Sequence, residues 1–150
     1  MKAVIQRVLS ANVEVEGDIV GEINKGFLIF LGIDQGDTQK TADILAAKTA
    51  KLRIFSDAED KMNLSLLDTG YEALVVSQFT LCADCKKGNR PSFASSAPTM
   101  LANELYEYFI KQLLNNGVSN VQNGIFGADM KVSLINDGPV TITYNTKEWE

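Results

Sequence analysis

The chain has 150 residues, of which 45% are apolar, so it can bury one substantial core and is too short for two. Its formal net charge of -5 argues against non-specific attraction to nucleic acid over the whole surface. The absence of histidine excludes catalytic triads built on that residue and removes the commonest metal ligand. We therefore expect a single domain over residues 1–150, with no metal and no cofactor.

The amino-terminal sequence "MKAVIQRVLS" interleaves apolar residues with Lys2, Gln6 and Arg7, unlike the apolar region of a signal peptide. The chain also lacks the run of roughly eighteen apolar residues that a membrane-spanning helix needs. Two cysteines, Cys82 and Cys85, are too few and too close together to staple the fold, which fits a reducing compartment. We expect a soluble, cytoplasmic protein with no membrane partner.

The first part of the chain predicts three strands. In residues 2–16 valines alternate with glutamates, the pattern of a half-buried strand, and the segment "DIVGEIN" follows as a second strand. Residues 26–33, "GFLIFLGI", are continuously apolar and predict a strand covered on both faces.

A change to helical spacing follows these strands. Asp37 or Thr38 can cap a helix, because a short polar side chain accepts a hydrogen bond from the first helical turn. Apolar positions then recur at intervals of three and four residues. The side of this helix that faces the core is expected to carry Ile44, Leu45, Lys48 and Leu52.

The middle of the chain predicts a hairpin, a strand and a second helix. Two strand-like pieces flank the polar turn 57–61, and the apolar strand "EALVVSQFTL" comes next. Residues 83–97 are polar and irregular. A second helix is expected from about Pro98 to Asn116, with Gly117 as its stop.

Residues 120–145 read as three short strands, interrupted by Asn-Gly at 123–124 and Gly-Pro at 138–139. The order of the predicted strands and helices along the chain indicates an α+β fold. We expect a mostly antiparallel, barrel-like sheet with two covering helices.

The segment "SQFTL" places Ser77, Gln78 and Thr80 at the end of a strand, where polar groups commonly line a site. A serine or threonine nucleophile needs a base, and none is adjacent in sequence. The competing interpretation is that these side chains only hydrogen-bond the backbone at the strand end.

Three further features each have a structural and a functional interpretation. Lys86, Lys87 and Arg90 form a basic loop that could contact phosphates or be simply solvated. The C-x-x-C of Cys82 and Cys85 could be a redox pair, but the residues after it break a helix. The Gly-Pro pair at 138–139 is ordinary hairpin punctuation on spacing alone.

Several segments together carry a resemblance to a known family: "MKAVIQRV", "RIFSDAEDKMNLS", "VVSQFTL", "GNRPSF" and "FGADMKVSLINDGPVT". They resemble the D-aminoacyl-tRNA deacylases, formerly called D-tyrosyl-tRNA deacylases, over nearly the full length. The motifs "SQFT" and "NDGPVT" are specific to that family, and both are complete here. The cysteine pair and the acidic balance depart from the family's usual appearance.

The resemblance implies an activity and a partner. Members of the family are homodimers with active sites at the subunit boundary. They hydrolyse the ester between a D-amino acid and the 3′-terminal adenosine of tRNA, and they also remove glycine mischarged on alanine tRNA. The resemblance further implies that a cis Gly138-Pro139 pair enters the neighbouring subunit's pocket and excludes L-amino acids.

The resemblance also implies roles for individual residues. The chemistry is expected to use the 2′-hydroxyl of the tRNA, with an amide near Phe79 or Thr80 stabilising the oxyanion. Arg7 is expected to reach across the dimer and brace the Gly-Pro filter. The remaining expected contacts are Ser77, Gln78, Phe79 and Thr80 lining the site, Phe126 and Met130 bordering the adenosine, and Lys86, Lys87 and Arg90 meeting tRNA phosphates.

Two alternatives remain at this point. One is a non-catalytic RNA-end binding module of the same fold, which catalytic turnover would separate from a deacylase. The other is a thiol redox protein that uses Cys82 and Cys85.

Overall fold

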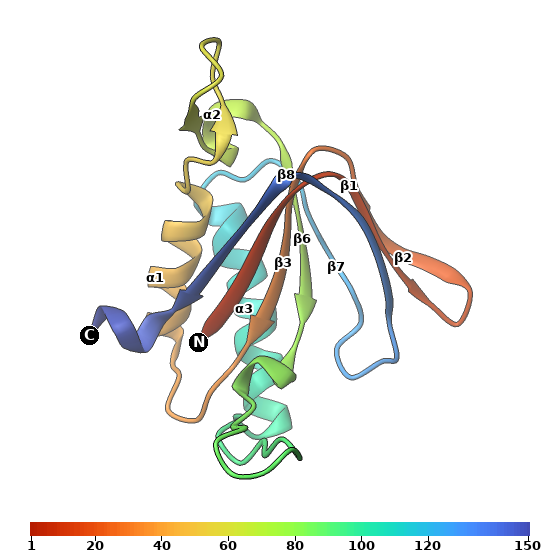
Figure 1. The fold of residues 1–150 in the computed structure, drawn as a ribbon, viewed down its shortest axis with the longest axis vertical. Coiled ribbons are helices and arrows are strands. Elements are labelled where there is room, and N and C mark those ends of the chain that lie inside the picture. Colours follow the sequence, from red (N-terminus) through yellow and green to blue (C-terminus); the bar gives the residue numbers. More distant parts are fainter.

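The computed structural model describes residues 1–150. A six-stranded mixed sheet forms its centre, with β1 (Lys2–Val15) as the strand to which three others pair (Figure 1). β8 (Lys131–Asn145) runs antiparallel along one edge of β1. The other edge of β1 pairs with β3 (Gly26–Gly32) in its first half and with β2 (Asp18–Ile23) in its second half.

Two parallel strands complete the sheet. β6 (Glu72–Ser77) pairs in parallel with β3, and β7 (Val121–Asn123) pairs in parallel with β6. Parallel neighbours need crossover connections, and here these connections contain the helices. The carboxyl ends of β3, β6 and β7 therefore point the same way and lie at one edge of the sheet.

β1 changes its buried face part-way along its length, which curls the sheet towards a barrel. Ala3 and Ile5 pack in the core beneath the helices, whereas Val8, Ala11 and Val13 pack in a second cluster on the opposite face of the sheet. The pairing of β1 with β8 shifts register between Gln6 and Ser10, at the point where the face changes. Irregular pairing of this kind bends a strand and increases its twist.

Two longer helices cover one side of the sheet, as Figure 1 shows. α1 (Gln39–Ala50) begins at the N-cap Thr38, and α3 (Thr99–Asn115) begins after Pro98. A short hairpin, β4 (Phe55–Ser56) and β5 (Met62–Leu64), and the four-residue α2 (Leu66–Thr69) lie between α1 and β6. No helix is long and apolar enough to cross a membrane.

The predicted α+β fold with a barrel-like sheet and two covering helices is confirmed, with local corrections. α2 was not predicted; its sequence lacks helical periodicity, and a Ser65–Asp68 capping box supports its single turn. Residues 120–145 form two strands and not three. β8 continues through Gly138 because β1 is long enough to pair with both of its halves.

The predicted inner face of α1 is partly wrong. Ile44 is 44% exposed and Lys48 is also exposed, while Leu45 is buried as expected. The contact face of α1 consists mostly of small side chains, which let the helix pack closely against its neighbours; a pattern that counts only large apolar residues misses this face. Its buried residues are Ala42, Leu45, Ala46, Thr49 and Ala50.

Candidate active site

A pocket of about 530 Å³ opens at the sheet edge where β6 ends, within the range of small-molecule sites. Three segments form its walls: the end of β6 with the following turn, residues 96–102 at the start of α3, and residues 126–132 between β7 and β8. Asp129 is the one titratable side chain that lines it, and Lys131 Nζ lies 3.1 Å from its carboxylate.

The end of β6 runs into a 3₁₀ turn beside the pocket. The Gln78 amide donates to the Leu31 carbonyl at 2.8 Å and so continues the sheet by one residue. The chain then turns into a 3₁₀ helix, η1 (Phe79–Cys82). The Leu81 amide donates to the Gln78 carbonyl, whereas the amides of Phe79 and Thr80 open the helix, where a 3₁₀ turn leaves its first N–H groups without an internal acceptor.

The side chains of the "SQFT" motif divide between pocket and surface. Ser77, Gln78 and Phe79 line the pocket. Phe79 is 57% exposed and packs edge-on against Phe93, with ring centroids 5.0 Å apart. Thr80 is exposed and does not line the pocket; its hydroxyl accepts a hydrogen bond from the Gln78 side-chain amide.

Phe126 and Met130, which are expected to border the adenosine, both line this pocket. The Phe126 ring lies 5.8 Å from the ring of Tyr106, which comes from α3 beneath it. The Tyr106 hydroxyl donates to the Val75 carbonyl at 3.0 Å, and burial raises the pKa of this phenol to about 12. This hydrogen bond ties α3 to β6 next to Phe126.

The loop after η1 carries the predicted basic residues on the surface. Lys86, Lys87 and Arg90 are all exposed, between the bridge partners Asp84 and Ser92. Phe93, which follows in the same loop, contacts the pocket residue Phe79. The basic side chains themselves do not line the pocket.

Gly138 and Pro139 lie outside this pocket, in a bulge of β8 that we call the tip, residues 137–140. Gly138 and Pro139 are exposed, whereas Val140 is buried in the core. In the pairing with β1, Asn136 lies opposite Val8 and Thr141 lies opposite Gln6. The four residues of the tip therefore lie opposite a single residue of β1, Arg7. The peptide bond between Gly138 and Pro139 is cis. Within one chain, therefore, Gly138 and Pro139 do not share the pocket that Ser77, Gln78 and Phe79 line.

Hydrogen bonds from its own chain hold the tip. Arg7 donates from Nε to the Asp137 carbonyl at 3.0 Å and from Nη1 to the Ile54 carbonyl at 2.6 Å. Its Nε also lies 3.5 Å from the Asp137 carboxylate. The Asn136 side chain accepts the Val140 amide at 2.8 Å. Arg7, expected to act across a dimer, thus braces the tip of its own chain.

Similarity to known proteins identifies the family of this chain. A family model described as D-Tyr-tRNA(Tyr) deacylase matches residues 4–145. A D-aminoacyl-tRNA deacylase from Geotalea uraniireducens is 57% identical over 146 residues, which are 97% of this chain and 94% of that protein. The chain belongs to this family. The resemblance stated from its motifs is thereby confirmed.

Solved structures agree on the fold. The structure of a c-Myc DNA Unwinding Element Binding Protein matches with a TM-score of 0.91 at 42% identity, covering 97% of this chain and 98% of that one. The structure of a probable eukaryotic D-amino acid tRNA deacylase matches with a TM-score of 0.81 over 95% of this chain and 97% of that one. At 17% identity the second likeness shows the fold alone.

Several pocket residues of this family member were not predicted from sequence. Ser96, Ala97 and Ala102 line the wall near α3, and Asp129 lines the wall that carries the "FGADM" segment. Small side chains before and within a helix give no signal of a site by themselves. The one available signal was that "FGADM" contains an acid between two predicted pocket residues, Phe126 and Met130.

The two cysteines have different surroundings. Cys82 is buried and donates from Sγ to the Ile33 carbonyl at 3.5 Å, whereas Cys85 is exposed, and both are free thiols. Burial, together with the nearby Asp34, raises the pKa of the Cys82 thiol to about 11. A redox-active cysteine needs a lowered pKa, so this environment favours the structural interpretation of Cys82.

Proposed function

We propose that this protein is an editing hydrolase that cleaves the ester of D-aminoacyl-tRNA and releases the free D-amino acid. The observation that carries the proposal is the pocket at the end of β6, where Ser77, Gln78 and Phe79 of the family motif "SQFT" line a cavity of about 530 Å³. A cavity of that size fits an aminoacyl group on a terminal adenosine better than a longer stretch of RNA.

The chemistry follows from what the pocket offers. Its lining contains no lysine, cysteine or histidine, and its one carboxylate, on Asp129, is paired with Lys131. We infer that the 2′-hydroxyl of the terminal adenosine takes part in the attack on the ester. The amide of Phe79 or Thr80 would then stabilise the oxyanion, an interaction that contributes about 3 kcal/mol.

The adenosine would be held by the opposite wall. Phe126 supplies an aromatic face, and Met130 supplies a polarisable side chain beside it. Stacking on aromatic side chains is the usual way in which proteins hold an unpaired base. Ser77 and Gln78 would then lie near the ester and orient it.

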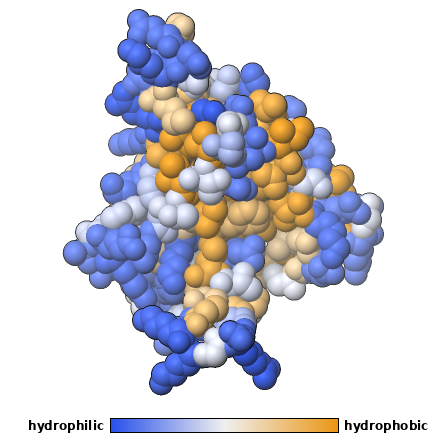
Figure 2. Space-filling view, in the orientation of Figure 1, coloured by the Kyte–Doolittle hydropathy of each residue, from blue (hydrophilic) through white to orange (hydrophobic).

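We further propose that two copies of the chain form a homodimer and complete each other's sites. Figure 2 shows apolar residues gathered on the sheet face opposite the helices, over β1 and β3. This face includes the partly buried Phe30, Val132 and Leu134. An uncovered apolar face of this kind favours a partner surface.

In this dimer the tip of one chain would enter the pocket of the other. Gly138 and Pro139 are exposed, and Arg7 fixes the backbone just before them. An L-amino acid would direct its Cβ against this backbone, whereas a D-amino acid directs it elsewhere and glycine has none. Exclusion of the wrong ligand by a clash gives discrimination without tight binding of the right one. Glycine mischarged on alanine tRNA would then also be accepted.

The tRNA would be contacted mainly at its acceptor end. Lys86, Lys87 and Arg90 are exposed in the loop that also carries Phe93, the neighbour of Phe79, and would pair with phosphates of the acceptor end. The net charge of -5 argues against a broad electrostatic footprint on the tRNA body. An aminoacyl-tRNA substrate places the protein in the cytoplasm.

The proposal is tested with three substrates: D-tyrosyl-, L-tyrosyl- and glycyl-tRNA. We expect turnover of the D-tyrosyl and glycyl esters and at least about a hundredfold slower turnover of the L-tyrosyl ester, equivalent to about 3 kcal/mol. The spontaneous hydrolysis of each ester without protein serves as the control. Equal cleavage of the L and D esters would remove the exclusion model.

A second candidate is a nucleic-acid-end binding module without catalysis. It is favoured by the match to a c-Myc DNA Unwinding Element Binding Protein at 42% identity, together with the exposed basic loop. A binding module would retain aminoacyl-tRNA without releasing the amino acid. The same assay, read for both retained and cleaved tRNA, distinguishes the two functions.

A further inference from the structure

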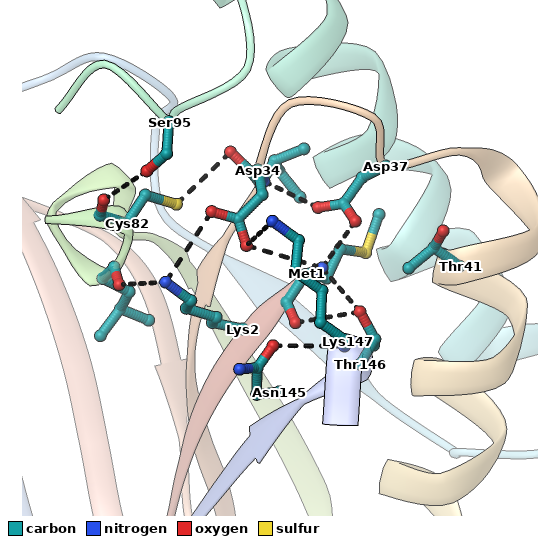
Figure 3. A network of polar contacts seen from close by, with 12 residues as sticks. Met1, Lys2, Asp34, Asp37, Thr41, Cys82, Ser95, Asn145, Thr146 and Lys147 are labelled. Atoms are coloured by element: carbon teal, nitrogen blue, oxygen red, sulfur yellow. Dashed lines mark hydrogen bonds and ion pairs between the residues drawn. The ribbon is translucent and has the colours of Figure 1, made fainter. Parts of the chain in front are cut away.

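A cluster of buried charges lies at the end of β3, next to the pocket wall (Figure 3). Asp34 is fully buried, and neither of its carboxylate oxygens accepts a hydrogen bond. Ammonium groups approach the carboxylate from three residues: Lys2 at 3.8 Å, Lys147 at 3.9 Å and Met1 at 4.0 Å. An apolar residue commonly stabilises such a position as well or better, so a buried carboxylate suggests a role other than packing.

The backbone around Asp34 holds one wall of the pocket. Asp34 forms an isolated β-bridge with Ser96. On either side of it, the Ala97 amide donates to the Ile33 carbonyl at 3.0 Å and the Gln35 amide donates to the Ser95 carbonyl at 2.8 Å. Since Ser96 and Ala97 line the pocket, a shift of residue 34 would move this wall.

Lys2 connects the same carboxylate to the other wall. Its ammonium group donates to the Leu81 carbonyl at 3.3 Å while lying 3.8 Å from Asp34 Oδ1. Leu81 belongs to η1, the turn that begins with Phe79. A cation at the carbonyl end of a helical turn is favourable, and the Asp34 charge keeps this cation in place.

Uncharged hydrogen bonds also join η1 to the end of β3 and to Ser95. Cys82 Sγ donates to the Ile33 carbonyl at 3.5 Å, and the Ser95 hydroxyl donates to the Cys82 carbonyl at 2.7 Å. The end of β3, the turn η1 and the segment 95–97 therefore form one connected unit. Asp34 is the charged centre of this unit.

We propose that Asp34 is a positioning residue for the deacylation site, acting through Lys2. Its buried charge fixes the Lys2 ammonium on η1 and thereby sets where the Phe79 and Thr80 amides point. At the same time its backbone fixes the Ser96 wall. The inference rests on the proposed function, because it assigns those amides to the reacting ester.

The chain offers a matched pair of lysines for the test. Lys2 and Lys147 lie at nearly the same distance from the Asp34 carboxylate. Lys2 also reaches η1, whereas Lys147 contacts neither pocket wall. Lys2→Met and Lys147→Met thus each remove one cation from the same carboxylate, and the first alone removes the link to the site.

We expect Lys2→Met to lower kcat on D-tyrosyl-tRNA about tenfold, with KM changed less than about threefold, since misplacement of a donor affects the chemical step. Lys147→Met should keep kcat within about twofold. Asp34→Asn, which keeps the shape and removes the charge, should lower kcat at least as much as Lys2→Met. Thermal unfolding of each variant reports stability separately.

Amide chemical shifts provide a readout independent of activity. In ¹⁵N-labelled protein, the Phe79 and Thr80 amide signals should move in Lys2→Met and stay in place in Lys147→Met. Unchanged signals in folded Lys2→Met, or equal kcat losses in the two lysine variants, would overturn the inference. If the unsubstituted protein cleaved no ester, the proposed function would fail, and the amide comparison would still decide whether Lys2 positions η1.

Discussion

The pocket and the tip differ in how their backbone polar groups are used. At the pocket, Phe79 lines the cavity and begins a 3₁₀ turn, whose first N–H groups, those of Phe79 and Thr80, have no acceptor within the turn. In the tip, Arg7 contacts the Asp137 carbonyl and the Asn136 side chain binds the Val140 amide. One region is hollow and offers donors, while the other protrudes and is already braced. This difference suits a site that binds and a segment that excludes.

The largest effect on the rate of cleavage is expected from a change in the substrate and not in the protein. Replacing the terminal adenosine of D-tyrosyl-tRNA by 2′-deoxyadenosine should slow cleavage about a thousandfold, because no protein base stands in for the hydroxyl. Thr80→Ala should keep activity within about tenfold, since this side chain does not line the pocket. Single-turnover rates measure both. A folded but inactive Thr80→Ala would instead favour a threonine nucleophile.

Removing the brace of the tip should have the next largest effect. Arg7→Ala leaves the carbonyls of Asp137 and Ile54 without their donor, which should lower the free energy of unfolding by about 2 to 4 kcal/mol. The ratio of D- to L-tyrosyl-tRNA cleavage should also fall. Arg7→Lys keeps the charge but cannot reach both carbonyls. Its free energy of unfolding and its D/L ratio should therefore lie between those of Arg7→Ala and the unsubstituted protein. Urea denaturation and the paired substrate assay measure these outcomes.

A pair of glycines compares the two regions directly. Gly138 in the tip has φ +134, and a Cβ there would lie 2.8 Å from Val140 Cγ2 and 3.1 Å from Arg7 Nη2. Gly127 at the pocket has φ +78 and open space around its Cβ position. Gly138→Ala should destabilise the fold by about 2 to 3 kcal/mol and Gly127→Ala by about 1 kcal/mol. If urea denaturation gave the same loss of unfolding free energy for both variants, the tip would not be tightly packed.

The hydrogen bond of Tyr106, behind the pocket residue Phe126, should show the smallest effect. Tyr106→Phe removes a buried hydrogen bond to the Val75 carbonyl, which still accepts the Gly124 amide at 3.2 Å, so the expected loss is about 1 kcal/mol. The matched control is Tyr108→Phe, which removes a hydroxyl contact to Asp43 at the surface and should change stability by less than about 0.5 kcal/mol.

The raised pKa of Tyr106 adds a dependence on pH with a defined sign. Burial raises this pKa from 10.0 to about 12, so the folded protein keeps the proton where the unfolded chain loses it. The corresponding stability is present below about pH 10 and is lost as pH rises towards 12. Tyr106→Phe should therefore lose less stability over this interval than the unsubstituted protein. An identical alkaline profile for both proteins would show that the phenol is not protected.

Hydrophobic patterning predicted the elements whose burial is nearly uniform. β3 and β6 read as strands because their central positions form continuous apolar runs, and α3 was found because its apolar stripe and its Pro98 and Gly117 boundaries agree. The pattern failed in α1, where the buried face is mostly alanine and threonine. It also failed for the parallel pairing of β3, β6 and β7, since periodicity carries no information about strand neighbours.

The candidate site was only partly predictable. Ser77, Gln78 and Thr80 could be proposed from their place at a strand end, and Phe79, Phe126 and Met130 from the family resemblance. All of these residues except Thr80 line one cavity. Ser96 and Ala97 reach that cavity through backbone bonds to Ile33 and Asp34, which are more than sixty positions earlier in the sequence. No local signal can reveal such contacts.

The sequence by itself determined the family, the α+β class and the absence of histidine chemistry, because these depend on residue types and their local order. Only the tertiary structure decided that the two family motifs lie apart in one chain and that Arg7 braces the tip of its own chain. It also decided that a buried carboxylate stands behind the pocket. The physical reason is that these relations are made by long-range pairing in a curled sheet, where residues distant in sequence become neighbours.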